Sequence, residues 1–112
     1  MRRAALALAL AALVLAGCAD GGRSAASLFQ EHCARCHGGD GRGDSRSVAL
    51  YPGLDLTSSR MVMAGARGRG ATYQRIADGY GAMPGFSGRL ESAEITRLVE
   101  YVQRLPKAKG GR

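Results

Sequence analysis

The chain has 112 residues, of which 46% are hydrophobic, and a formal net charge of +7. One hydrophobic core is the usual solution at this length, which excludes a second domain of ordinary size. The sequence has no nucleic-acid recognition motif, so its positive charge favours acidic proteins or anionic lipid headgroups as partners.

Residues 1–17 have the pattern of a secretory signal peptide. Arg2 and Arg3 give a positively charged start, and residues 4–16 form an unbroken apolar run that ends in small residues. This run is shorter than the roughly 20 residues that cross a bilayer as a helix, so a retained transmembrane anchor is the weaker alternative. Cleavage would remove two of the 16 basic residues and lower the formal charge from +7 to +5.

Residues 15–18, Leu-Ala-Gly-Cys, resemble the lipobox of bacterial lipoprotein precursors, in which the cysteine becomes the first residue and carries lipid. The resemblance implies that acyl chains on Cys18 anchor the protein to the cell envelope, facing the periplasm. In such lipoproteins an Asp after the cysteine favours the inner membrane, whereas Ala19 here favours the outer membrane. Cleavage nearby that leaves Cys18 as a free thiol is the alternative. Residues 18–26 are small and polar, and predict a flexible, lipidated tether.

A first helix is predicted from Ser27, which can cap it, into Cys33. Leu28 and Phe29 begin its apolar face. Glu31 follows in the first turn, near the positive end of the helix dipole.

Residues 33–37, Cys-Ala-Arg-Cys-His, form a C-x-x-C-H motif, the pattern of covalent c-type haem attachment. Two intervening residues let both thiols reach the vinyl groups on one edge of a porphyrin, and the next residue then lies under the iron. A neutral imidazole is a good iron ligand there, so Cys33 and Cys36 are the predicted attachment residues and His37 a predicted metal ligand. A thioredoxin-like redox pair, a zinc site and a structural disulfide are the alternatives. The first needs strands that this sequence does not predict, the second would crowd four donors into six residues, and the third would close a very small loop.

Glycine is frequent in residues 38–70, which predict mostly loop with a short helical turn over 57–64. A second helix is predicted over 71–78, with Gly79 ending it in the left-handed conformation. No stretch alternates apolar and polar residues long enough to form a sheet, so the predicted fold class is all-α.

The last helix has the strongest periodic signal. Apolar residues at i, i+3, i+4, i+7 and i+10 predict one buried face, made of Ile95, Leu98, Val99, Val102 and Leu105. Glu91 is a weak cap residue at its start, and Pro106 stops it. The predicted domain therefore spans residues 27–106, and residues 107–112 predict a basic, disordered tail.

Residues 28–41 resemble the opening of the small monohaem cytochromes c with His/Met ligation, and residues 81–86, Gly-Ala-Met-Pro-Gly-Phe, resemble the loop that carries the second axial ligand in that family. The last helix, with Tyr101, resembles the C-terminal helix of the family. The resemblance implies a cytochrome c fold of three or more short helices wrapped around a covalently bound haem, whose iron is the redox centre.

The second iron ligand has few candidates. His32 lies beside the motif on the same helix and cannot reach the opposite haem face, so it is predicted to be a surface residue. Methionine remains, at Met61, Met63 or Met83. Met83 is favoured, because Pro84 stiffens the loop after it and the neighbouring glycines allow a close approach to the haem. The alternative for Met83 is a flexible core filler, and the other two methionines are predicted to be packing residues.

Supporting roles follow from the same resemblance. Pro52 resembles the residue whose carbonyl accepts a hydrogen bond from the proximal histidine, and Phe29 and Tyr101 resemble the contact between the first and last helices. Arg67 or Arg69 could meet a haem propionate or an acidic patch of a partner, with a solvated loop as the alternative.

The resemblance implies that the protein is an electron carrier rather than an enzyme. It would relay single electrons between membrane or periplasmic redox partners, as a monomer or as part of a complex. One alternative is a haem c subunit of a dehydrogenase, reductase or quinol-oxidising complex. Another is a ligand-sensing or peroxidatic haem protein in which Met83 is not bound.

Overall fold

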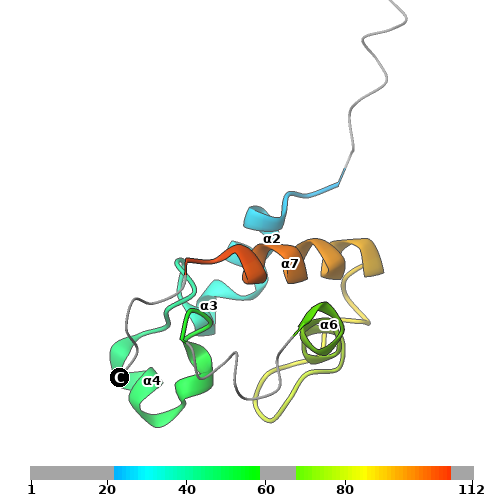
Figure 1. Ribbon diagram of the computed structural model, residues 1–112. Coiled ribbons are helices and arrows are strands. Elements are labelled where there is room, and N and C mark those ends of the chain that lie inside the picture. The colour runs from blue at the N-terminus through cyan, green and yellow to red at the C-terminus, as the bar shows by residue number, and fades with distance from the viewer. Residues whose placement is uncertain (1–21, 59–67, 107–112) are drawn as a thin grey trace, which may run out of the picture.

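The computed structural model describes residues 22–58 and 68–106. The described elements are α2 (Ala25–His32), α3 (Ala34–His37), α4 (Ser45–Leu50), the 3-10 helix η1 (Pro52–Leu54), α6 (Gly68–Asp78) and α7 (Ser92–Arg104). Two of these helices, α2 and α6, lie beside the last helix, α7, and α4 lies apart from it (Figure 1). Across these two ranges no strand forms, and Tyr80 and Met83 make an isolated antiparallel bridge. The predicted all-α fold class is confirmed.

None of the helices in the described ranges is long and apolar enough to span a membrane. The signal peptide predicted over 1–17 and the tail predicted over 107–112 lie outside the described residues.

Helices α2 and α7 pack against each other and make the centre of the core. Their apolar faces supply most of the largest fully buried side chains: Leu28, Phe29, Ile95, Leu98 and Val99. The rings of Phe29 and Tyr101 lie 5.0 Å apart between centroids and are tilted by 41°, an arrangement that the quadrupoles of aromatic rings favour. The predicted contact between the first and last helices and the predicted apolar face of α7 are confirmed.

Helix α6 also packs against α7 and buries Thr72, Ile76 and Ala77. It spans Gly68–Asp78, so its end agrees with the prediction of 71–78 and its start is earlier. The first turn contains two glycines, which disfavour a helix. Arg69 in this turn forms an ion pair with Glu100 of α7, a tertiary contact that the local sequence does not reveal.

Gly79 ends α6 with a φ of +79°, which confirms the predicted left-handed cap. Its N–H donates to the Arg75 carbonyl at 3.0 Å. A Cβ atom at this position would lie 2.5 Å from the Met83 carbonyl oxygen. Glycine therefore lets the next loop fold back over the end of α6, where the Phe86 N–H donates to the Ile76 carbonyl at 3.0 Å.

The first helix begins at Ala25, and the prediction that Ser27 caps it is wrong. Ser24 is the cap residue, and its hydroxyl oxygen accepts a hydrogen bond from the Ser27 N–H at 3.1 Å. Ala25 and Ala26, which the sequence assigned to the tether, are strong helix formers and join the helix once Ser24 caps it. Arg23 precedes the cap and pairs with Glu31 of α2 and Glu94 of α7, at 2.7 and 3.3 Å.

Two short helices, α4 and η1, lie in the region that the sequence predicted to be mostly loop. Asp44 caps α4, because its carboxylate accepts bonds from the Ser47 hydroxyl at 2.7 Å, the Ser47 N–H at 3.0 Å and the Arg46 N–H at 3.4 Å. The sequence predicted a loop here because glycine is frequent just before this segment, and that prediction did not take the Asp44 cap into account. Most of the turn predicted over 57–64 lies outside the described residues.

The core assignment can be tested with two matched leucines. Leu98 is fully buried, whereas Leu50 is 76% exposed. In the haem-loaded protein, Leu98→Ala should lower the free energy of unfolding by about 2–5 kcal/mol, while Leu50→Ala should change it by less than about 0.5 kcal/mol. Chemical denaturation measures both values, and equal effects would contradict the observed core.

Capping of α4 makes a pH-dependent prediction. The Ser47 hydroxyl, followed by the Ser47 and Arg46 N–H groups, holds the pKa of Asp44 below its ordinary value of 3.8. A carboxylate whose pKa is lower in the folded than in the unfolded state stabilises the fold at every pH above its unfolded-state pKa. This stabilisation is lost as the pH falls through the folded-state pKa. The difference in unfolding free energy between wild type and Asp44→Asn should therefore be constant around neutral pH and become smaller as the pH falls below 3.8. A difference that stays constant throughout the acid range would contradict the role of the cap.

Candidate haem-attachment site

The C-x-x-C-H motif folds as one tight turn at the end of α2. Cys33 follows the last residue of α2, and the next four residues form α3. The Cys33 carbonyl accepts bonds from the N–H groups of Cys36 at 3.2 Å and His37 at 2.9 Å. The turn therefore holds the two cysteines and the histidine together, as the sequence predicted from their spacing.

Both cysteines of the motif are free thiols rather than a disulfide. Cys36 is exposed and Cys33 is half-buried. Burial, and secondarily the charge of neighbouring Cys36, raises the pKa of Cys33 to about 11. Reactive thiols of redox pairs instead have lowered pKa values, because the thiolate is the nucleophile. The described ranges contain helices and no strand, so they lack the strand context of a thioredoxin-like pair.

A backbone carbonyl orients the imidazole of His37. Nδ1 lies 2.9 Å from the Leu54 carbonyl oxygen, and a carbonyl can only accept, so Nδ1 carries the proton and donates. The lone pair then resides on Nε2, the tautomer that binds a metal ion through this nitrogen.

The acceptor for this bond differs from the prediction, which assigned it to Pro52. The 3-10 turn η1 explains the difference, because the Pro52 carbonyl already accepts the Asp55 N–H at 3.2 Å. The same turn brings the carbonyl two residues later, that of Leu54, to His37.

His32 is not the surface residue that the sequence predicted. Its side chain is 17% exposed, and its ring meets Phe86 edge-on with 5.7 Å between centroids. Nε2 is buried with no hydrogen-bond partner among the described residues, and the nearest carboxylate oxygen, on Glu31, is 3.6 Å away. His32 therefore packs the end of α2 against the loop that contains Met83, a role that only the Phe86 contact reveals.

Met83 lies in a tight turn between α6 and α7. Tyr80 and Met83 exchange two backbone hydrogen bonds of 3.0 and 2.9 Å. The Met83 side chain is half-buried and packs against the edge of the core, so the flexible-filler alternative describes part of what it does. The other two candidates, Met61 and Met63, lie outside the described residues.

These donors fit a covalently attached haem. The motif offers two free thiols and an imidazole whose Nδ1 proton is fixed by a carbonyl, and the turn after α6 offers a thioether. Soft thioether sulfur and neutral imidazole are the axial ligands of cytochrome c iron. In the described ranges, no three His, Cys, Asp or Glu side chains converge as ligands for a free metal ion.

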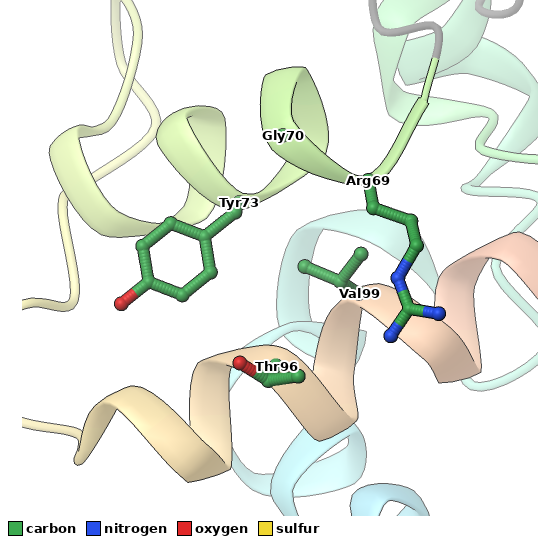
Figure 2. Close-up of a pocket in the computed structure, with 5 residues that line it drawn as sticks. All are labelled: Arg69, Gly70, Tyr73, Thr96 and Val99. Atoms are coloured by element: carbon green, nitrogen blue, oxygen red, sulfur yellow. The ribbon is translucent and has the colours of Figure 1, made fainter.

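A groove of about 250 Å³ between α6 and α7 lies away from the motif. Figure 2 shows the residues that line it: Arg69, Gly70, Tyr73, Thr96 and Val99. None of them is a cysteine, histidine or methionine, so the lining contains no predicted haem-attachment residue or iron ligand. Since the guanidinium of Arg69 pairs with Glu100, its charge serves helix packing. Arg67, the other arginine considered for a propionate, lies outside the described residues.

The sequence of this chain is similar to those of known proteins. The family model described as "Cytochrome C oxidase, cbb3-type, subunit III" matches residues 20–102. The chain is 36% identical over 83 residues to the cbb3-type cytochrome c oxidase subunit CcoP of Cereibacter sphaeroides, covering 71% of this chain and 26% of that protein. It is 30% identical over 76 residues to cytochrome c6 of Synechocystis, covering 68% of this chain and 58% of that protein.

A solved structure shares the fold. The KustC0563 c-type cytochrome superposes with a TM-score of 0.63 at 22% identity, covering 76% of this chain and all of that one. The chain thus matches the whole of a solved cytochrome, although it spans only 26% and 58% of the two curated relatives named above.

Proposed function

The chain belongs to the cytochrome c family represented by the cbb3-type subunit III model, whose members bind haem c, and from this premise we propose that it is an electron carrier. In this proposal Cys33 and Cys36 hold the haem through thioethers, and His37 Nε2 and the Met83 sulfur bind its iron. The haem, when bound, supplies a centre that takes up and releases one electron reversibly.

The hydrogen bond from His37 Nδ1 to the Leu54 carbonyl, at 2.9 Å, is the observation that carries this proposal. It fixes both the tautomer and the ring orientation of the proximal ligand, as outer-shell partners of metal-bound histidines do. The ring is held from two sides, since its own backbone is in α3 and its Nδ1 is bonded to a carbonyl after α4. A ligand held in this way moves little when the iron gains or loses an electron.

The second ligand determines the reaction class. If His37 and Met83 both bound the iron of an attached haem, they would leave no open position for oxygen or peroxide, which supports electron transfer as the function. Methionine opposite histidine raises the reduction potential. Tyr80 and Met83 are tied by two backbone hydrogen bonds, so the turn around Met83 is braced for a ligand role.

A role as a haem c subunit of a larger oxidoreductase is the second candidate. It is favoured because one relative is an oxidase subunit, of which this chain matches 26%. In both candidates the partners are redox proteins. Acidic docking surfaces would suit exposed arginines near the motif, such as Arg35, Arg42 and Arg46.

The proposed location is the cell envelope. Lipid on Cys18 would anchor the domain on the periplasmic side, at the outer membrane as Ala19 favours, with residues 18–22 as the tether before Arg23 and the Ser24 cap of α2. Several acyl chains on one residue hold a protein firmly, because each buried methylene adds about 0.8 kcal/mol.

Substitution of the methionines tests the ligand assignment and the reaction class together. Met83→Ala should abolish the weak red absorption band of methionine bound to ferric haem, and the reduced protein should then bind carbon monoxide. Wild type and the matched control Met63→Ala should keep the band and resist carbon monoxide. Carbon monoxide binding by reduced wild type would instead support a sensing or peroxidatic protein.

The anchor is tested separately at its cysteine. In a bacterium that exports and matures the protein, Cys18→Ala should remove the acyl mass from the N-terminal peptide and move the protein from the membrane to the soluble fraction. Haem content should stay unchanged, since Cys33 and Cys36 are intact. Membrane retention of this variant after residues 1–17 have been removed from it would rule out the lipid on this residue as the anchor.

A further inference from the structure

We propose that Gly43 is a positioning residue for the proximal ligand: it leaves the Leu54 carbonyl the space it needs to accept the Nδ1 proton of His37, and so sets the reduction potential. This inference rests on the proposed function. Gly43 has no side chain and supplies no ligand atom to the iron, so it would act on the ligand through the groups around it, chiefly the Leu54 carbonyl.

Gly43 is linked to both partners of the His37–Leu54 bond. Its N–H donates to the His37 carbonyl at 2.7 Å. A Cβ atom built at residue 43 would lie 3.3 Å from the Leu54 oxygen and 3.4 Å from the Leu54 carbonyl carbon. A side chain at this position would therefore press on the same carbonyl group that accepts the imidazole proton.

The opposite side of Gly43 is closed as well. The same Cβ atom would lie 2.7 Å from Cγ2 of Val48, on α4. Valine is branched at Cβ and has restricted χ1 rotamers, so it cannot swing aside as a long side chain would. The backbone of Gly43 has a φ of +69°, a conformation that side chains disfavour. Both the space and the conformation therefore require glycine.

The carbonyl of Leu54 has little freedom to move away. The Leu54 N–H donates to the Tyr51 carbonyl at 3.0 Å. Two residues later, the Leu56 N–H donates to the Gly41 carbonyl at 2.7 Å. Between them, the Asp55 carboxylate accepts the Thr57 N–H at 2.8 Å and the Thr57 hydroxyl at 2.6 Å. Thr57 is almost fully buried, with 1% exposure. A side chain at residue 43 would therefore alter the hydrogen bond between His37 Nδ1 and the Leu54 carbonyl, because the segment around Leu54 is too constrained to move away.

The chemical consequence has a defined sign. A carbonyl that accepts a hydrogen bond from Nδ1–H makes the imidazole a more basic ligand, and a more basic ligand favours oxidised over reduced iron. Weakening this bond should therefore raise the midpoint potential. Gly43 lies outside the α2–α7 core, so the helix packing should be retained in such a variant.

The test compares haem-loaded wild type, Gly43→Ala and Gly68→Ala. Gly68 has a similar φ of +77°, and among the described residues no atom lies within 4 Å of a Cβ built there, so it reproduces the backbone strain without the contact. Gly43→Ala should raise the midpoint potential and shift the His37 Nδ1 proton resonance of the reduced protein upfield. Gly68→Ala should leave both readouts at the wild-type values, although its stability falls.

If Gly43→Ala does not accumulate with haem, the double variant Gly43→Ala/Val48→Ala gives the same two readouts. It removes the 2.7 Å contact with Val48 and keeps the 3.3 Å contact with the Leu54 oxygen, so an upward shift that is smaller than that of Gly43→Ala is expected. An unmoved potential and an unmoved resonance in the haem-loaded variants would overturn this inference alone. Absence of covalently bound haem from the wild-type chain would overturn the proposed function and this inference together.

Discussion

The packing of α2 on α7 is the contact on which the rest of this protein depends. Phe29 is the residue that connects this packing to the site, because its ring stacks on Tyr101 at 5.0 Å and its carbonyl accepts the Cys33 N–H at 2.8 Å. Aromatic burial of this kind contributes several kcal/mol to stability. The same residue therefore stabilises the core and fixes where the haem-attachment turn begins.

The turn around Met83 is tied to this centre by a second set of contacts. Gly79 lets the chain reverse at the end of α6, and Phe86 is 4% exposed and donates its N–H to α6. The Phe86 ring also meets His32 at the end of α2, with 5.7 Å between centroids. The segments that carry the two candidate iron ligands are thus joined through side chains next to them, and not by the haem alone.

Rigidity around the ligands suits a carrier of single electrons. Both candidate axial residues lie in backbone turns closed by hydrogen bonds, and the proximal imidazole has its Nδ1 proton fixed by a carbonyl. The α4–η1 segment, which buries no side chain of its own, contributes by presenting that carbonyl. A segment that buries no side chain therefore matters through its backbone, which the glycine-rich composition of residues 38–70 did not reveal.

Local patterns in the sequence were enough to predict the all-α class, the apolar face of α7 and the glycine cap of α6, and to single out the C-x-x-C-H motif of Cys33, Cys36 and His37. Each of these is encoded by local spacing or by the conformational needs of single residues. The sequence also predicted the contact between Phe29 and Tyr101 from the family resemblance. Three features are seen only in the folded chain. The Leu54 carbonyl, rather than that of Pro52, accepts the hydrogen bond from His37 Nδ1, Ser24 caps the first helix, and His32 packs against Phe86. These features depend on which backbone and side-chain groups come into contact when the chain folds, and the local pattern of residue types does not specify those contacts.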